Sequence, residues 1–328
     1  MQLPILALAA IATITAATPD YRITGPYTHS NLSIYLVHAQ EKTIEKTYLT
    51  LDEAMQHRLV IVYETSDVNT LLIANVSNEE VYIQSGDIVK GGKQDRVIKE
   101  DMILQSMSGK VPIQVFCVEQ GRWTQRGGES SGQFGSSKQS ISGNKMKMAV
   151  RGEGDQRAVW DKVAEAQDRL SHNLAAPVQS KQSVSSFQLT LESENLRATA
   201  HAYESAMTPL IDRYKDAIGY VVAVNGKVTA ADVYASPSLF RKLWPKLIAS
   251  ASVEAIAAGQ LATPAAAPSY DVVKNVVTGP KDTKPATAQQ INERTEVKKK
   301  ESESGIMFET RDAKAGAGPA VHRSYVAK

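Results

Sequence analysis

The sequence predicts an α+β fold in which a mainly β amino-terminal half packs with the helices and the Asn-Gly β-hairpin of the carboxy-terminal half as one compact domain. Three observations lead to this class. Short runs rich in Val and Ile alternate with turn residues over 21–123, apolar residues recur every three or four positions over 159–214, and an Asn-Gly pair separates two apolar runs at 225–226. A division into two domains at 126–147 is the alternative, but neither half has enough strands to close its own sheet.

The first half of the chain contains six segments with the composition of strands. They are residues 34–38, 59–63, 71–76, 81–84, 88–90 and 111–119. The polar residues 77–80 between the third and fourth segments predict a hairpin loop. One short helix is expected over 51–58, because Thr50 and Glu53 fit a capping box.

A stretch rich in glycine and serine follows these strands. Between Arg126 and Lys147, 11 of 22 residues are Gly or Ser, and only Phe134 and Ile141 are suited to burial. This composition predicts a flexible loop, and long loops inside compact domains are often lids or binding loops. We therefore expect either disorder or a segment that orders over a ligand.

Two amphipathic helices are expected next. Their apolar stripes are Val159, Val163, Ala166 and Leu170 in the first, and Leu196, Ala200, Tyr203, Met207, Leu210 and Tyr214 in the second. Pro209 is expected to kink the second helix. Asn225 and Gly226 predict a type I′ turn between two strands, because both central residues of that turn need positive φ. Ser236 then begins a helix that runs to about Ala258 with a break at Pro245.

The last part of the chain changes in composition. Residues 262–304 are rich in Ala, Pro, Thr and Lys, which predicts a polar linker with at most one helix. Residues 305–328 contain two short apolar runs separated by glycines, which predicts a terminal hairpin that packs back on the domain.

The amino terminus predicts export. Residues 3–17 are apolar and end in small residues, with Thr15 and Ala17 at the spacing of a cleavage site, and the run is too short to span a membrane. Residues 1–17 are thus expected to be a signal peptide, and residues 18–261 an exported domain with no membrane anchor. The first three residues carry no Lys or Arg, so a cytoplasmic protein with a buried first segment is the alternative.

Charge and cysteine content argue against several classes of function. Thirty-seven basic and 35 acidic residues leave a net charge of +2, which does not suit nucleic-acid binding. The six histidines show no metal-binding spacing, so no metal site is expected, and His322 is expected to be structural. Cys117, the one cysteine, lies in an apolar run, which predicts a buried and unreactive thiol.

The first candidate site is a turn between two predicted strands. Gly91 and Gly92 would let the backbone approach an anion, Lys93 and Arg96 would add charge, and Gln94 would add an amide. Such a group suits a phosphate, a carboxylate or a ribose. The alternative is a tight turn in which Lys93 and Arg96 are solvated.

The second candidate site is the end of the strand after Cys117. Arg122 and Trp123 could clamp a base or a sugar ring, and Glu119 or Asp95 could act as an acid or base if buried beside the cations. The alternative is a tryptophan that covers the core, with Glu119 paired to Arg122 inside the fold.

These two segments resemble one known family. The family is the ARPP domain, the ADP-ribosylglycohydrolase-and-rhodanese-phosphatase-superfamily-associated protein domain. The chain resembles it in the segments Gly91-Gly92-Lys93-Gln94-Asp95-Arg96 and Cys117-Val118-Glu119-Gln120-Gly121-Arg122-Trp123, and also in Leu51-Asp52-Glu53-Ala54 and parts of 223–255. The resemblance covers about residues 21–259. The family is essentially uncharacterised, and its name implies association with proteins that process ADP-ribose. By this likeness the site residues would be Gly92, Gln94, Arg96, Glu119, Arg122 and Trp123.

Two functions are consistent with the sequence. The first is a ligand-binding domain for a nucleotide or an ADP-ribose-like phosphate compound, with no reaction or cofactor specified. The second is a non-catalytic exported scaffold or protein-interaction module, in which the motif residues satisfy buried polar groups. The two functions predict different geometries for the side chains of Gln94, Arg96, Glu119 and Trp123. In a binding domain these side chains converge on an open concavity, whereas in a scaffold they interlock beneath the surface.

Overall fold

The fold was taken from a computed structural model, which describes residues 21–39, 46–65, 67–122, 126, 133–141, 143–280, 283–316 and 318–328. The expected signal peptide over residues 1–17 and the predicted site residue Trp123 lie outside these residues.

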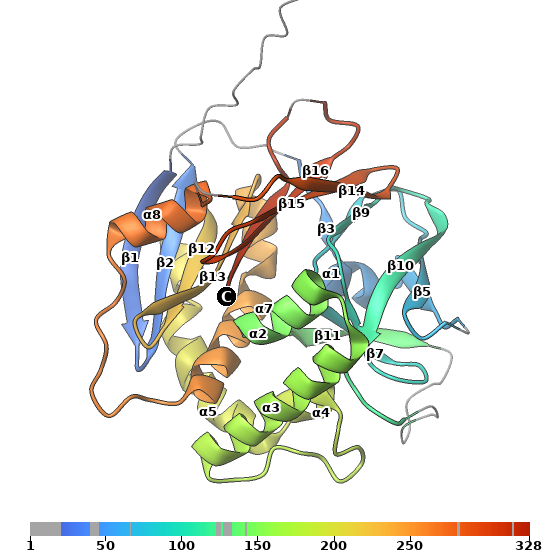
Figure 1. The fold of residues 1–328 in the computed structure, drawn as a ribbon. Helices are drawn as coiled ribbons and strands as arrows, with labels where there is room; N and C mark the ends of the chain where they lie inside the picture. Colours follow the sequence, from blue (N-terminus) through green and yellow to red (C-terminus); the bar gives the residue numbers. More distant parts are fainter. Residues whose placement is uncertain are drawn as a thin grey trace, which may run out of the picture.

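An eight-stranded antiparallel sheet forms the largest part of the molecule (Figure 1). In spatial order its strands are β1 (Tyr21–His29), β2 (Leu32–Ala39), β12 (Ala217–Val224), β13 (Lys227–Tyr234), β17 (His322–Ala327), β16 (Gly305–Asp312), β15 (Thr295–Glu301) and β14 (Thr287–Asn292). Strand β2 pairs with β12, with Ile34 opposite Val222. Because the first and last thirds of the chain share this sheet, the chain does not divide into two domains at 126–147.

Two smaller sheets complete the β structure. The six-stranded sheet has the order β11 (Phe134–Ser140), β7 (Asp87–Gly91), β8 (Arg96–Ile98), β10 (Gly109–Cys117), β5 (Thr70–Asn75) and β4 (Val60–Tyr63). The three-stranded sheet consists of β3 (Leu49–Thr50), β6 (Val81–Ile83) and β9 (Met102–Leu104). Figure 1 shows β5, β7 and β10 on the opposite side of the molecule from β1 and β2.

The predicted hairpin at 77–80 is wrong, because β5 and β6 belong to different sheets. The side chain of Asn75, at the end of β5, donates to the carbonyl oxygens of Glu79 at 2.7 Å and Gln105 at 3.0 Å. Its own oxygen accepts from the backbone N–H of Ser77 at 3.0 Å. These bonds turn the chain out of the first sheet and into the second.

The helices among the described residues are α1 (Leu51–Gln56), α2 (Asn144–Lys147), the π-helix η1 (Met148–Glu153), α3 (Gln156–Leu174), α4 (Phe187–Leu191), α5 (Glu194–Met207), α6 (Leu210–Arg213), α7 (Pro237–Ala258) and α8 (Tyr270–Thr278). Helices α3, α4 and α5 lie at the bottom of the view in Figure 1, whereas α8 lies at the upper left beside β1 and β2. Helix α7 packs against β12, α3 and α5, and one hydrophobic core includes residues of all four elements. The shared core makes this a single compact α+β domain.

Most of the helix predictions are confirmed. The capping box is present, since Glu53 donates its N–H to the Thr50 hydroxyl at 3.2 Å and accepts from the Thr50 N–H at 2.9 Å. Pro209 precedes α6 rather than kinking α5, which ends at Met207. The predicted break at Pro245 is wrong: α7 continues through it, because its neighbours are packed in the core and compensate for the missing N–H bond.

The glycine- and serine-rich stretch is not a loop throughout. Residues 134–140 form β11, which pairs with β7 and places Phe134 opposite Gly91. Residues 144–147 form α2, while 127–132 lie outside the described residues. Serine and glycine do not favour a strand. Residues 134–140 form one because they hydrogen-bond to the edge of β7, and this pairing cannot be read from their own composition.

Residues 262–304, expected to be a polar linker, contain α8, β14 and β15. Helix α8 packs on β13 and β1, and buries Val273 and Val277. In the lysine-rich β15, Thr295 and Val297 are buried on one face and Lys298 and Lys300 lie on the other. Lys299 shares the face of Thr295 and Val297 and donates to the Gly152 carbonyl at 3.2 Å. Strands β16 and β17 pair with each other, and β17 pairs with β13. No helix among the described residues is long and apolar enough to cross a membrane.

Candidate functional site

The glycine pair of the first predicted site contacts the protein itself. Gly91 and Gly92 have φ of +113° and +57°, and a Cβ on Gly92 would lie 2.2 Å from the Phe134 ring. Glycine is required at both positions for these reasons. Their N–H groups donate to Asp95 Oδ1 at 3.0 Å and to the Gln133 carbonyl at 3.2 Å.

The next N–H group along the chain is also occupied. Lys93 donates its backbone N–H to Glu64 Oε2 at 2.9 Å. The three successive N–H groups that the sequence offered to an external anion therefore bind acceptors within the fold, two of them carboxylates.

Asp95 is the centre of this region and is completely buried. Its Oδ1 accepts from Gly91 N and from Arg126 Nη2 at 3.3 Å, and its Oδ2 accepts from Arg126 Nη1 at 2.8 Å and Ser186 Oγ at 3.2 Å. A carboxylate has about four acceptor positions. All are occupied, so the geometry gives Asp95 no capacity to act as a general base.

Glu119 and Arg122 form the ion pair that the scaffold interpretation expects. Arg122 Nε lies 2.7 Å from Glu119 Oε2, and Arg122 also donates to the Gly92 carbonyl at 3.2 Å. Gln94 donates its side-chain amide to the Glu119 carbonyl at 3.1 Å. Gln94 and Glu119 are both buried, and the Arg122 side chain is 8% exposed.

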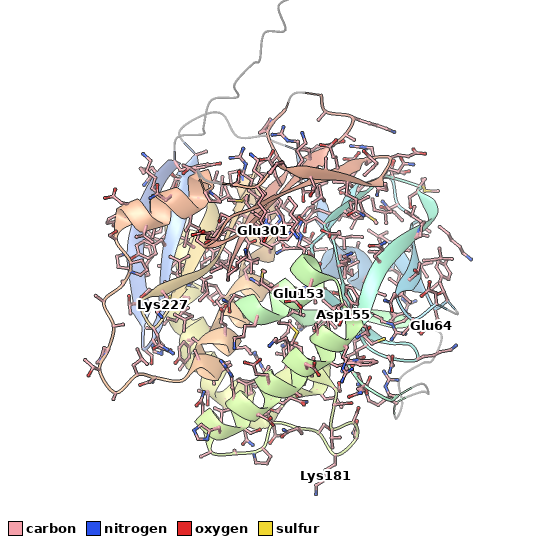
Figure 2. All side chains as sticks on the ribbon, in the orientation of Figure 1. Glu64, Glu153, Asp155, Lys181, Lys227 and Glu301 are labelled. Carbon is pink, nitrogen blue, oxygen red and sulfur yellow. The ribbon has the colours of Figure 1, made fainter. Side chains whose placement is uncertain are left out.

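Arg96 is fully buried rather than solvated. Its Nε donates to the Val68 carbonyl at 3.3 Å, and its Nη2 lies 3.7 Å from Glu64 Oε1. Figure 2 shows Glu64 on the side of the molecule that carries β5 and β7. Lys93 is half-buried.

We call the charged members of this cluster the motif network: Glu64, Asp95, Arg96, Glu119, Arg122 and Arg126. The structure brings together all the predicted site residues that it describes. All of them except the half-buried Lys93 lie beneath or almost beneath the surface, where they interlock. Sequence analysis missed Glu64, Arg126 and Ser186. Glu64 and Ser186 are distant from both motifs in the chain, whereas Arg126 lies three residues after Trp123. Nothing in their local sequence marks any of the three as a partner.

Cys117, beside the motif network, is buried, and burial raises the pKa of its thiol to about 11. Only the thiolate reacts with alkylating agents, and roughly one thiol in a thousand is ionised three pH units below its pKa. We expect iodoacetamide at pH 8 to modify the native protein at least ~100-fold more slowly than the urea-unfolded protein. Mass spectrometry of timed samples measures both rates, and equal rates would show that the thiol is accessible.

A second buried cluster surrounds His322, and sequence analysis missed its other members. The imidazole lies between Asp101 and Asp232, with Nδ1 2.8 Å from Asp101 Oδ2 and Nε2 3.0 Å from Asp232 Oδ1. Arg151 and Thr310 also donate to Asp101 Oδ2, at 3.1 and 2.5 Å. We call these five residues the His322 network.

The charges of the His322 network support one another. Burial opposes ionisation, but Asp101 and Asp232 together raise the pKa of His322 above its ordinary value. Burial likewise opposes the charged form of Asp101, yet Arg151 and His322 hold its pKa well below the usual range. Asp101 precedes β9, whereas Asp232 and His322 lie on β13 and β17. The network therefore connects the three-stranded sheet to the eight-stranded sheet.

A hollow lies elsewhere, between α2, α3, the β12–β13 hairpin and the end of α7. We call it the α2–α7 pocket. Its volume is about 430 Å³. The apolar part of its lining consists of Met146, Ala166, Leu170, Val224, Val228, Val253, Ala257, Ala258, Leu261 and Ala327.

The α2–α7 pocket has a cationic rim. Lys145, Lys162 and Arg169 all pair with one carboxylate, Glu165, at 2.7 to 2.8 Å. Hydrogen bonds from Lys145 and Lys162 lower the pKa of Glu165 to about 2. Lys227, on the hairpin, also lines the pocket and has no ion pair with any residue that the structure describes. Lys328, whose ammonium lies 2.9 Å from Glu301, also lines the pocket, so five cationic side chains surround it.

One acidic side chain lies deeper in the same pocket. Glu254 of α7 is buried, and its Oε1 accepts from the N–H of Asn144 at 3.3 Å. Burial raises the pKa of Glu254, although the charge of Lys147 opposes this. A carboxyl that tends to stay protonated can donate a hydrogen bond as well as accept one. Within the described parts of the chain, no group of three or more His, Cys, Asp and Glu side chains is placed to hold a metal ion.

The fold and the two motif segments define a single α+β domain organised around buried ionic networks. The family model of ARPP-1, the ARG and Rhodanese-Phosphatase-superfamily-associated Protein domain, matches residues 20–326, and the chain belongs to this family. The resemblance to the ARPP domain is thereby confirmed, and the match extends past residue 259 to include α8 and the last four strands. No curated protein and no solved structure matched the chain.

Proposed function

We propose that the protein binds a small anionic compound with an apolar or ring portion in the α2–α7 pocket, and that a nucleotide or an ADP-ribose-like phosphate compound is the class of ligand. One observation carries the proposal: a hollow of about 430 Å³ combines an apolar lining with five cationic side chains. Small-molecule sites are typically concave, about 300–1,000 Å³ in volume, largely apolar, and supplied with a few polar groups that orient the ligand.

The chemistry of the lining suggests how such a ligand would lie. Arg169 offers a planar fork suited to phosphate, and Lys227 offers a charge that no described acid neutralises. Val253 and Ala257 contribute to the apolar lining against which a ring would pack. Glu254, at the inner end, can donate to or accept from a ring nitrogen or a hydroxyl. The proposal is of binding, and no reaction is assigned.

Filling the pocket tests the proposal most directly. Ala258 is exposed and lines the pocket, so Ala258→Trp is expected to occupy the ligand's space without disturbing the core. Ala164 is also exposed but belongs to the outer face of α3, so Ala164→Trp is the matched control. In a thermal-shift assay with ADP-ribose at 100 times Kd, the wild type and the control should gain about 2.7 kcal/mol, and Ala258→Trp should gain nothing.

Charge at the rim is tested separately. Lys227→Ala should weaken binding of ADP-ribose and AMP by ~5- to 10-fold and leave adenosine binding unchanged, because only the phosphates use the cation. Lys181→Ala is the control, and Figure 2 shows Lys227 and Lys181 on different parts of the molecule. If ADP-ribose, AMP and inorganic phosphate all fail to bind the wild type by calorimetry, the proposal is overturned.

A protein-interaction module without a small ligand is the second candidate. It is favoured by the motif network, because the residues expected to bind a ligand instead interlock inside the fold. Under this alternative the α2–α7 pocket binds none of the test compounds, and the two tryptophan variants behave alike.

We also propose that the protein is exported, whether it binds a small ligand or acts as a protein-interaction module. Export is supported by the apolar run at 3–17 and the small residues Thr15 and Ala17. Mass spectrometry of the mature protein tests it: a chain that begins at Thr18 supports cleavage, and one that begins at Met1 contradicts it.

A further inference from the structure

Strand β14 is an unprotected edge of the eight-stranded sheet. It pairs only with β15, and residues 287–290 are exposed at consecutive positions, so neither face of this segment is covered. Soluble proteins usually protect edge strands with lysine, proline or a bulge. Strand β14 reads Thr-Ala-Gln-Gln-Ile-Asn, without charge or proline, and its register shift falls only after Gln290.

The opposite edge of the same sheet is protected. Pro26 lies within β1, and the register of β1 against β2 shifts between Thr24 and Tyr27. A partner strand therefore cannot continue along β1, whereas the first four residues of β14 remain regular and open.

The register shows which amides face the open edge. Ser302 donates its N–H to the Gly305 carbonyl and so closes the β15–β16 hairpin as a hydrogen-bonded pair. Hydrogen-bonded and non-bonded pairs alternate along antiparallel strands, so Lys298 bonds to β16. Ala288, opposite Lys298, then directs its N–H and carbonyl away from β15, as does Gln290 opposite Glu296. No described residue hydrogen-bonds to the main chain of Ala288 or Gln290 on that side.

Two hollows adjoin this strand. They measure about 340 and 220 Å³, and both are lined by Glu100 and Gln289. We call the two together the β14 groove.

The charges of the β14 groove favour an acidic occupant. Its cations outside the buried ion pairs are Lys99 and Lys299, against the acid Glu153, because Arg151 is buried and paired with Glu100 and Asp101. Burial raises the pKa of Glu100, although the charge of Arg151 opposes this. Figure 2 shows Glu153 near the middle of the view and Lys227 at its left.

We propose that an extended acidic segment of a partner protein pairs with β14 as a ninth strand, with its main chain bonded to Ala288 and Gln290 and its carboxylates near Lys99 and Lys299. Addition of a strand to an open sheet edge is a common mode of peptide recognition, in which main-chain bonds supply affinity and side-chain contacts supply specificity. The inference does not depend on ligand binding in the α2–α7 pocket.

A synthetic peptide that alternates Val and Glu, labelled with fluorescein, is the probe. Fluorescence anisotropy with the full chain should show saturable binding, and the same peptide with Lys in place of Glu should bind at least ~10-fold more weakly. Binding of the acidic peptide should also weaken as NaCl is raised, because the partly exposed charges are screened.

The strand geometry is tested at Ala288. Ala288→Pro removes the outward N–H but leaves the bonds to β15, and should weaken binding at least ~10-fold. Ala288→Ser keeps the N–H and should bind within ~2-fold of the wild type. Thermal melts establish that both variants are folded. If Ala288→Pro does not fold, Lys99→Ala, which removes a groove cation, should still weaken binding of the acidic peptide by ~3-fold or more.

Three results would overturn the proposal. They are the absence of saturable binding of the acidic peptide, equal affinity of Ala288→Pro and the wild type, and concentration-dependent dimerisation that Ala288→Pro abolishes. The last, measured by sedimentation velocity, would assign β14 to a second copy of this chain instead of a partner protein.

Discussion

Replacing Asp95 by alanine is expected to lower the free energy of unfolding by about 3–5 kcal/mol, the usual cost of removing one partner from a buried ion pair. The Arg126 side chain is only 3% exposed and would lose both of its bonds to the carboxylate. The backbone N–H of Gly91 would lose its acceptor as well. Urea unfolding, followed by circular dichroism, measures the change.

Two further variants establish the cause. Asp95→Asn keeps the shape and part of the hydrogen bonding, so it should cost less than Asp95→Ala but still destabilise, because the charge is lost. Asp168 is exposed on α3, and Asp168→Ala should change stability by less than about 0.5 kcal/mol. If Asp95→Ala unfolds at the urea concentration of the wild type, the motif network does not hold the fold together.

The second large effect is expected at His322. His322→Leu should cost about 3–5 kcal/mol, because it leaves Asp101 and Asp232 facing each other in the core without the cation between them. It also removes the ring that stacks on Tyr234 with a centroid distance of 4.4 Å. The control is His201→Leu on the exposed face of α5, which should change stability by less than about 0.5 kcal/mol.

The pH dependence gives this prediction a distinct signature. The pKa of His322 is raised in the folded state, so between its ordinary value of 6.5 and the raised value the native protein holds one more proton than the unfolded chain. The contribution of His322 is therefore complete below pH 6.5 and decreases as the pH rises through the folded-state pKa, by at most about 1.4 kcal/mol per pH unit.

This decrease should be absent from His322→Leu, which lacks the titrating group. Urea unfolding of both proteins from pH 6 to pH 9 measures the difference in slope. The titratable and charged groups around the imidazole are Asp101, Asp232, Arg151, Tyr82 and Tyr234. Burial raises the pKa of both tyrosines well above its ordinary value, so they stay neutral over this range. Parallel slopes in the two proteins would show that His322 is not protonated in the native state.

These two networks bear on the meaning of the family motifs. The segments that identify the family, residues 91–96 and 117–123, supply most of the buried ion pairs of the motif network. A ligand site and a structural network require similar residue types, namely glycine, arginine and acid. The geometry favours the structural role here, since the N–H groups and carboxylates bind one another.

The sequence by itself determined the features that depend on neighbours a few positions away. The capping box of Thr50 and Glu53, the apolar stripes of α3 and α5, and the Ser236 cap of α7 follow from local spacing. The family also follows from short segments, and it is confirmed over nearly the whole chain.

Only the tertiary structure decided the features that depend on partners distant in the chain. Asp95 meets Arg126 and Ser186, and His322 meets Asp101, 221 positions away, and no local pattern encodes these pairings. The same reason explains why 134–140 and 295–301 are strands despite their composition, since each completes the hydrogen bonding of a neighbouring strand. Local propensity is weak compared with the free energy of satisfying a sheet edge or a buried charge, and that free energy is set by the assembled fold.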